Sequence, residues 1–364
     1  MKNQEKQTVL LGMSGGVDSS VAALLLKKKG YKVIGIFLKN YSDTKNKITG
    51  ECSWIEEREM AKKIASILQI PLLTLDYEKE YKKYVINKMF KDYAKGLTPN
   101  PDISCNTIIK FPALWKKAKD LKADYIATGH YVKVKNSKNG YELLQGKDKK
   151  KDQSYFLYEL SQSDLSHSIF PLGNLTKEEV RKIAKKNHFP NWNKPGTKGI
   201  CFVGKINMKD FLKRKINEKK GKILSPEGEK IGIHPGISFF TIGERIGSKD
   251  VFIENSYRNK TKSKLYVADK RKNNILVVAP EGNSILKKKE IKIKNLKIIN
   301  KNEKIPFNFK ARIRHLGNLL KGRIKKKNKN YHFILNKSEK GIAPGQSIVI
   351  YHKNRVIGGG EISS

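Results

Sequence analysis

Cysteine is scarce in this sequence, with three residues among 364, at positions 52, 105 and 201. Because an odd number of cysteines cannot pair completely, a fold held together by disulfides is excluded, and we expect thiols that pack, bind a ligand or react. Zinc sites usually combine closely spaced Cys-x-x-Cys or Cys/His pairs, and neither spacing occurs among the three cysteines and seven histidines. The sequence therefore does not predict a dedicated zinc site.

Long hydrophobic runs are missing as well. No stretch of about 18 apolar residues occurs. The N-terminus, MKNQEKQ, is polar where a signal peptide would carry an apolar core. We therefore expect a cytoplasmic protein that does not associate with a membrane.

Acidic residues are few relative to basic ones. Asp and Glu number 34 against 76 Lys and Arg, which leaves a net charge of +42. A solvated, lysine-rich surface accounts for part of this excess, yet an excess of this size also gives strong binding to a polyanion through counterion release. The composition therefore favours nucleic acid as a partner, and 364 residues are enough for two or three domains.

The loop in VLLGMSGGVDSSVAALLLKKKG lies between a predicted buried strand, 9–13, and a predicted helix, 19–29. Gly15 and Gly16 allow the backbone to approach a ligand, and the unpaired N–H groups at the start of the helix attract an anion. Asp18 is a candidate Mg²⁺ ligand beside a phosphate. Neither the lysine of the G-x-x-x-x-G-K-[ST] loop nor the G-x-G-x-x-G spacing is present. An ordinary tight turn is the alternative, but the neighbouring serines favour a phosphate site.

Strand and helix patterns alternate up to about residue 130. The predicted strands are 32–39, 71–76 and 125–130, and the predicted helices are 53–68, 79–95 and 111–121. This rhythm predicts an α/β fold, a parallel, doubly wound sheet with helices on both faces.

The pattern changes beyond this point. Asn139-Gly140 predicts the turn of a β-hairpin, and 177–186 reads as a further helix. From about residue 239, short β-rich segments separated by Gly and Lys turns predict a small barrel or sandwich. The predicted domains are 1–205, a nucleotide-binding catalytic domain; 206–280, a small central domain; and 281–364, a β-barrel that contacts the nucleic acid.

A second informative stretch is KGLTPNPDISCNTIIKF, where Pro99 and Pro101 cannot continue the preceding helix. We expect an ordered loop that presents polar and thiol side chains, namely Asn100, Asp102, Cys105 and Asn106. A buried structural cysteine is the alternative. Cys201, in KPGTKGICFVG, lies in another glycine-punctuated segment, and two loop cysteines suit thiol chemistry better than packing.

Seven motifs resemble, in order and approximate spacing, those of the bacterial tRNA-specific 2-thiouridylase family: GMSGGVDSS, TPNPDISCN, ATGHY, KDQSYFL, KGICFVG, TIGERIG and GIAPGQ. The first is similar to the pyrophosphate loop of enzymes that split ATP between its α and β phosphates, which alone marks only a superfamily. The NPDxxCN motif with a second cysteine near residue 200 is much more specific. The resemblance covers essentially the whole chain and implies a pyrophosphatase-type α/β domain, a small central domain and a C-terminal β-barrel.

The resemblance implies that ATP adenylates the C2 oxygen of the wobble uridine, position 34, in the tRNAs for Glu, Gln and Lys, and that sulfur then replaces it. The implied ATP-binding residues are Gly12, Met13, Ser14, Gly15, Gly16, Val17, Asp18, Ser19, Leu38 and Gly129. Leu38 departs from the methionine common in the family, with similar apolar contact. A Mg²⁺ ion on Asp18 would accompany ATP.

The implied sulfur chemistry uses two thiols. Cys201 matches the cysteine that accepts a persulfide sulfur from a relay protein or a cysteine desulfurase, and Cys105 matches its nucleophilic partner. Attack of one thiol on the persulfide leaves a Cys105–Cys201 disulfide that a reductant must reset. Asp102 matches a base toward the uridine or the thiol. An Fe–S cluster on these three residues is the alternative.

The resemblance also implies tRNA contacts, at Asn100, Pro101, Asp102, His130, Lys151, Asp152, Gln153, Arg314, His315 and Gln346. For each of them, a solvated or capping side chain is the alternative. Glu244, Thr107 and Ile108 depart from the family pattern, and the first removes a possible donor near RNA. We expect Cys52 to pack and the enzyme to act as a monomer.

Two other functions compete with this interpretation. A different adenylating ligase would need the loop but neither thiol, and a catalytically inactive RNA-binding protein would need the basic barrel but not the loop. Asp18, Cys105 and Cys201 are all present, which favours the thiolation enzyme.

Overall fold

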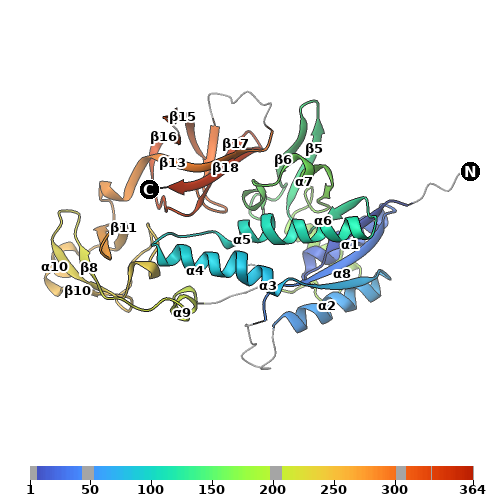
Figure 1. Cartoon of the computed structure of the whole chain (residues 1–364), viewed down its shortest axis with the longest axis horizontal. Helices are drawn as coiled ribbons and strands as arrows, with labels where there is room; N and C mark the ends of the chain where they lie inside the picture. The colour runs from blue at the N-terminus through green and yellow to red at the C-terminus, as the bar shows by residue number, and fades with distance from the viewer. Residues whose placement is uncertain (1–5, 43–52, 197–206, 301–308, 329, 364) are drawn as a thin grey trace, which may run out of the picture.

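The computed structural model describes residues 6–42, 53–196, 207–300, 309–328 and 330–363, arranged as three sheets with their helices (Figure 1). Within this described part of the chain, no helix is both long and apolar enough to cross a membrane.

The first sheet is parallel, with strand order β3-β2-β1-β4-β7. Its strands are β1 (Thr8–Gly12), β2 (Lys32–Lys39), β3 (Leu72–Asp76), β4 (Tyr125–Ala127) and β7 (Ser168–Ile169). Alternate residues of β1 point to opposite faces, so that Val9 and Leu11 join one apolar core and Leu10 joins another. Helices α1 (Val17–Lys28), α2 (Ser53–Ile67) and α8 (Lys177–Lys186) contribute to the first core, and α6 (Phe111–Asp120) contributes to the second. The predicted doubly wound α/β fold is confirmed.

Two longer helical segments contain π-helical turns. The first joins α3 (Glu78–Tyr81), η1 (Lys82–Ile86) and α4 (Asn87–Ala94), and the second joins α5 (Pro101–Ser104), η2 (Cys105–Lys110) and α6. The prediction of a loop through residue 106 is therefore wrong beyond Asn100. Asn100 is the N-cap, its side chain accepts from the Asp102 N–H, and Pro101 occupies the first helical position, where no donor is needed.

The second sheet, in the central domain, has the order β10-β9-β8-β12-β11. Its elements are α9 (Met208–Lys213), β8 (Gly221–Leu224), β9 (Lys230–His234), η4 (Ile237–Phe239), β10 (Phe252–Ile253), α10 (Asn255–Thr261), β11 (Leu265–Arg271), β12 (Ile275–Pro280) and η5 (Ser284–Leu286). Strands thus begin at Gly221, upstream of the predicted onset near residue 239. The prediction missed β8 and β9 because both strands are short and a bulge interrupts their pairing.

The third sheet closes on itself as the predicted β-barrel, through pairing of its first and last strands, β13 and β18. Its strands are β13 (Lys287–Ile298), β14 (Phe309–Arg312), β15 (Leu320–Lys327), β16 (Asn330–Lys340), β17 (Ser347–His352) and β18 (Arg355–Ser363). The predicted hairpin is present as β5 (Val132–Ser137) and β6 (Gly140–Gln145), and β6 pairs with β18. The hairpin therefore extends the barrel sheet from the catalytic domain, as its place beside the barrel in Figure 1 shows.

Segment 151–166 supplies the remaining elements of the catalytic domain, η3 (Ser154–Leu157) and α7 (Gln162–Ser166). Tyr155 and Tyr158 of this segment share an apolar core with Val349 and Tyr351 of β17. The segment therefore packs the catalytic domain onto the barrel.

The central domain is attached through a shared apolar core. Met89, Phe90 and Tyr93 of α4 pack with Phe211 and Phe240. Figure 1 shows α4 reaching from the catalytic domain toward this second sheet. Just after α4, the Lys270 Nζ donates to the Gly96 carbonyl at 2.9 Å, which ties the two domains together at one point.

Lys270 makes stability depend on pH. Burial lowers its pKa from 10.5 to about 8, although the Glu244 charge opposes the change. Above about pH 8 the folded protein releases a proton that the unfolded chain still holds, so the free energy of unfolding should rise by about 1.4 kcal/mol per pH unit until the unfolded lysine titrates. Relative to Lys270→Met, the wild type should gain about 2 kcal/mol between pH 7 and pH 9.5 in urea unfolding. The exposed Lys272→Met serves as control, and parallel curves for wild type and Lys270→Met would contradict the assignment.

Candidate active site

The loop between β1 and α1 is built to leave backbone donors available. Gly15 has φ +68°, and a Cβ there would lie 2.2 Å from the Glu57 carbonyl oxygen, so only glycine fits. Gly16 is the N-cap of α1 and has no side chain to occupy the first N–H groups. The Ser14 N–H bonds to the Ser19 hydroxyl at 3.2 Å, which fixes the curve of the loop. This geometry suits an anion at the helix N-terminus.

Asp18 is held by two donors from distant parts of the chain. Its Oδ1 accepts from the Tyr131 hydroxyl and from the Lys177 Nζ, each at 2.6 Å. Burial, followed by the Asp18 charge, raises the pKa of Tyr131, so the phenol stays protonated as a donor. The first turn of α8 thus places a lysine beside the loop. Sequence reasoning missed Lys177 because it lies 159 residues away from Asp18.

Asn191 is another residue that the sequence did not single out. Its buried side chain donates to the Gly15 carbonyl and to the Ser20 hydroxyl, each at 3.0 Å. Asn191 therefore stabilises the conformation of the loop through these two hydrogen bonds.

The other predicted ATP residues surround the same loop. A Cβ on Gly129 would lie 3.0 Å from the backbone of Asp18 and Ser19, so the strand end after β4 touches the start of α1. Leu114 of α6 would contact a Cβ on Gly12 at 3.4 Å. The side chains of Met13, Val17 and Leu38 are buried in the flanking cores and shape the loop from beneath.

Mg²⁺ fits this arrangement only as an ion held mainly by phosphates. Among the described residues, no group of three or more His, Cys, Asp or Glu side chains gathers as metal ligands. Mg²⁺ commonly uses one or two carboxylates and takes its other ligands from phosphates and water. Asp18 can supply one such ligand, in competition with Lys177.

The N-terminus of α5 brings the NPD motif to the barrel. The Asn100 side chain hydrogen-bonds to the Tyr155 hydroxyl, which itself donates to the Ser347 carbonyl at 2.7 Å. Asp102 lies one turn before Cys105 on the same helix and is half-buried. The helix then passes through the π-turn η2, a feature that often marks functional sites.

Cys105 has no exposed surface and packs with the core that α3 and α4 share with the central domain. This placement is compatible with a cysteine that only packs and with a catalytic cysteine. In the second case the thiol must become exposed before it reacts. Cys201 and Cys52 lie outside the described residues. The predicted pairing of Cys105 with Cys201 therefore stays a prediction.

The KDQ motif lies at the interface between domains. Asp152 is fully buried and pairs with Arg312 of β14, with 2.7 Å between Oδ2 and Nη1. Its oxygens also accept from Gln145 and Ser154. Asp152 thus has a structural role here, and its contact with RNA stays a prediction.

The two neighbours of Asp152 in the KDQ motif differ in exposure, since Gln153 is half-buried and Lys151 is exposed. The Gln153 Oε1 accepts from the Tyr131 N–H at 3.0 Å, which ties the motif to the residue that holds Asp18.

His130 and His315 are both neutral at pH 7. Burial, with a contribution from Lys110, puts the pKa of His130 well below its usual range, and its Nδ1 lies 2.7 Å from the Thr128 hydroxyl. Burial lowers the pKa of His315 to about 4, and its ring centroid lies 4.2 Å from that of Phe156, with the ring planes tilted by 35°. Neither imidazole therefore supplies positive charge to a phosphate.

Arg314 is exposed at the tip between β14 and β15. Among the predicted RNA residues, Arg314 and Lys151 are thus exposed cations. Asp152, His315 and Gln346 instead contact residues of another domain.

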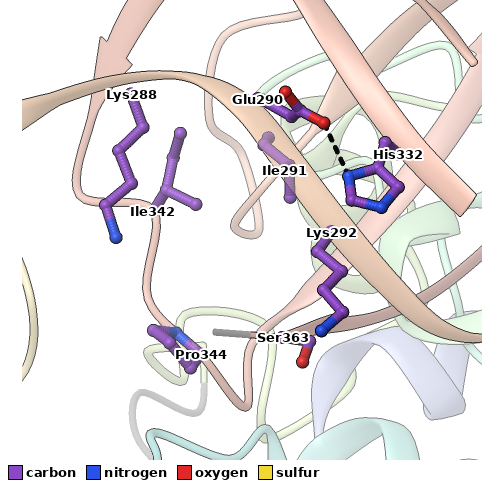
Figure 2. Close-up of a pocket in the computed structure, with 8 residues that line it drawn as sticks. All are labelled: Lys288, Glu290, Ile291, Lys292, His332, Ile342, Pro344 and Ser363. Atoms are coloured by element: carbon purple, nitrogen blue, oxygen red, sulfur yellow. Dashed lines mark ion pairs between the residues drawn. The ribbon is translucent and has the colours of Figure 1, made fainter. Parts of the chain in front are cut away.

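Two cavities involve the barrel. One, of about 270 Å³, lies beside Asn100 and Pro101, between α4 and barrel residues that include Gly345 and Ser347. The other, of about 190 Å³, is on the barrel and includes the Glu290–His332 pair, 2.7 Å apart (Figure 2). The residues lining the second cavity include none of those predicted to bind ATP or RNA, so the first is the candidate for the target nucleotide.

Glu244, at the position where the family pattern has a possible donor near RNA, makes contacts within the central domain. Its carboxylate accepts from the Thr241 N–H at 2.8 Å and pairs with Lys209 at 3.2 Å.

Comparison with known proteins gives a consistent result over the chain. Family models match residues 7–205 (tRNA methyl transferase HUP domain), 209–280 (tRNA methyl transferase PRC-barrel domain) and 288–362 (aminomethyltransferase β-barrel domain). A solved 4-thiouridine synthetase bound to RNA and ATP covers 57% of this chain and 50% of its own, at 17% identity and a TM-score of 0.35, a likeness too distant to carry an argument.

Curated relatives match much more closely. The tRNA-specific 2-thiouridylase of Karelsulcia muelleri is 42% identical, with 99% of this chain and 100% of that protein covered. Those of Malacoplasma penetrans and Coxiella burnetii are 41% and 40% identical, with 97% and 99% of this chain and 98% and 99% of the relatives covered. Because the identity is this high over nearly the full length of each protein, the chain belongs to the family of tRNA-specific 2-thiouridylases.

Proposed function

We propose that this protein is an ATP-dependent tRNA-uridine 2-sulfurtransferase, which replaces the C2 oxygen of the wobble uridine, position 34, by sulfur. The observation that carries the proposal is the full-length match to relatives named for this activity. Two structural features add physical support: the loop in which only glycine fits at position 15, and the helix start that carries the NPDxxC motif.

In the first half-reaction, the loop between β1 and α1 binds the phosphates of ATP. The N–H groups from Gly15 to Ser19 would bind phosphate oxygens, and Lys177 would neutralise their charge. Attack of the uridine C2 oxygen on the α-phosphate expels pyrophosphate and converts a poor leaving group into AMP. Mg²⁺, when bound, would offset charge on the pyrophosphate, with Asp18 as one ligand.

In the second half-reaction, the two cysteines exchange sulfur. The Cys105 thiolate attacks the inner sulfur of a Cys201 persulfide, which forms the Cys105–Cys201 disulfide and releases hydrosulfide. Hydrosulfide then attacks C2, and AMP leaves with the former C2 oxygen. Asp102, one helical turn from Cys105, takes the proton, and a dithiol reductant restores both thiols. Because Cys105 is buried, this step requires the helix or its neighbours to move when RNA binds.

The partners follow from charge and resemblance. A net charge of +42 supports tRNA binding, with Glu, Gln and Lys anticodons as the expected substrates. The sulfur would come from a relay protein or a cysteine desulfurase. An Fe–S cluster that holds sulfide on Cys105, Cys201 and Asp102 is the alternative to the persulfide.

The proposal is tested by reconstitution. The purified full chain, unmodified tRNA, sodium sulfide, a dithiol reductant and Mg²⁺ should give 2-thiouridine on nucleoside mass spectrometry only when ATP is added. Equal thiolation without ATP, or no 2-thiouridine when ATP is present, would contradict it.

Lys177 should contribute strongly to ATP binding. Loss of a charged hydrogen bond costs about 1.5–3 kcal/mol, so Lys177→Met should raise the KM for ATP by about 10- to 100-fold. Lys182→Met, on an exposed position of the same helix, is the matched control. If both variants show the wild-type KM for ATP in an AMP-release assay, Lys177 does not face the phosphates.

A further inference from the structure

We propose that Tyr131, which follows β4, is a positioning residue for ATP binding that orients the Asp18 carboxylate toward the Mg²⁺ ion accompanying the phosphates. This role rests on the proposed function, in which the loop between β1 and α1 binds ATP. Tyr131 belongs neither to the residues predicted to bind ATP nor to those predicted to contact tRNA. Its hydrogen bonds nevertheless join one group to the other.

The Tyr131 hydroxyl binds one particular oxygen of Asp18. It donates to Oδ1 at 2.6 Å, and the Lys177 Nζ reaches the same oxygen, also at 2.6 Å. Because both donors bind Oδ1, neither of them occupies Oδ2. Two charge-assisted hydrogen bonds to one oxygen restrict the rotation of a carboxylate and leave its second oxygen for a cation. Carboxylates that bind metal ions are commonly held by hydrogen bonds in this way.

The ring of Tyr131 is fixed beneath the loop. It is buried and belongs to the same apolar core as Val17 and Val21 of α1. The Lys177 Nζ lies over the ring, 6.0 Å from its centroid. A ring held on both sides cannot change rotamer freely, because the packed core leaves no room for the alternatives. The hydroxyl therefore keeps a constant position relative to the start of α1.

The backbone of Tyr131 is held by the KDQ motif. Its N–H donates to the Gln153 Oε1 at 3.0 Å, and its carbonyl accepts from the Gln153 N–H at 3.2 Å. Gly146 also packs against this carbonyl, since a Cβ there would lie 2.6 Å from the oxygen. The Gln153 amide nitrogen takes no part in these two bonds, which are therefore compatible with the predicted contact of this side chain with tRNA.

The orientation of Asp18 matters because Mg²⁺ accepts only a narrow range of ligand geometry. A carboxylate that must be ordered at each binding event weakens binding, whereas one that is already oriented carries no such entropy cost. The contribution of Tyr131 acts through the ion. We therefore expect Tyr131 to strengthen nucleotide binding only when Mg²⁺ is present.

The test measures nucleotide binding by Tyr131→Phe, which removes the hydroxyl and keeps the ring that packs in the core. The probe is α,β-methylene ATP, which cannot be split between its α and β phosphates, and its Kd is measured by calorimetry on the full chain without tRNA. With Mg²⁺ in excess, the Kd of Tyr131→Phe should be about 10-fold above that of the wild type. With EDTA in place of Mg²⁺, the two proteins should agree within about twofold.

Tyr125→Phe is the matched control, because Tyr125 of β4 packs against the same apolar core. This variant should bind the analogue as the wild type does, with Mg²⁺ and with EDTA, and the Kd for tRNA should be unchanged in both variants. A Kd of Tyr131→Phe that rises equally with and without Mg²⁺ would indicate a general packing defect. That result, or a Kd with Mg²⁺ that is unchanged or lower, would overturn the proposal.

If thermal unfolding shows that Tyr131→Phe does not fold, Gly146→Ala gives a second test, because its Cβ would displace the Tyr131 carbonyl. Gly146→Ala should show the same loss of binding, limited to the measurement with Mg²⁺, and a loss that does not depend on Mg²⁺ would again overturn the proposal. Failure of the proposed function is distinguishable, because the wild type would then form no 2-thiouridine, whereas these measurements follow nucleotide binding alone.

Discussion

Gly15→Ala is expected to abolish adenylation. The methyl group would lie 2.2 Å from the Glu57 carbonyl oxygen, and the φ of +68° is itself strained for alanine. Displacement of the loop removes several backbone donors at once, and a loss of about 3 kcal/mol in transition-state binding corresponds to a rate about 100-fold lower. AMP release in the presence of tRNA should therefore fall by about 100-fold or more, while the Kd for tRNA stays close to that of the wild type.

The matched control is Gly196→Ala. Its Cβ meets no heavy atom within 4 Å and its φ lies outside the left-handed region, so neither clash nor strain arises. This variant should release AMP at the wild-type rate. Thermal unfolding of both variants separates loss of the loop from loss of the fold, because Tm responds to the whole domain. Undiminished AMP release by folded Gly15→Ala would show that the loop does not bind ATP.

The two cysteines are expected to fail at different steps. Cys201→Ser should not accept labelled sulfur from a persulfide donor, whereas Cys105→Ser should accept sulfur, retain it and form no 2-thiouridine. Both should still adenylate tRNA, because neither thiol takes part in that step. The physical reason is that a thiolate is a nucleophile at neutral pH and a hydroxyl is not. The measurements are protein-bound label, pyrophosphate release for the adenylation step, and nucleoside mass spectrometry.

The control for this experiment is Cys52→Ser, which should thiolate tRNA normally, because Cys52 is predicted only to pack. Since Cys105 is fully buried, Cys105→Ser also needs a stability measurement. A structural cysteine would lower Tm without stopping the reaction at a defined step. Normal 2-thiouridine formation by Cys201→Ser would reject the persulfide and favour sulfide held by a cluster or supplied from solution.

Local patterns were enough to predict most of the catalytic sheet. The strand predicted at 32–39 and the helix predicted at 177–186 have the same bounds in the structure. The Asn139-Gly140 turn is also found where the sequence placed it. These features depend on neighbouring residues, since side-chain periodicity and turn residues act over a few positions.

The start of α5 shows where a local signal was misinterpreted. An asparagine followed by proline fits the N-cap and first position of a helix, yet the prolines suggested a loop. Proline ends a preceding helix and also begins the next one, so the same residue permits both interpretations.

The sequence by itself determined the glycine loop between β1 and α1, because two glycines between a strand and a helix specify its local geometry. It also determined the alternating elements and the charge. Only the tertiary structure placed Lys177 beside Asp18, paired Asp152 with Arg312 and brought Gln346 to the backbone of Thr98 and Pro99. Each of these contacts joins residues more than 150 positions apart. Such pairs depend on how whole domains pack, and no periodicity or local propensity encodes which distant side chain meets a given backbone group.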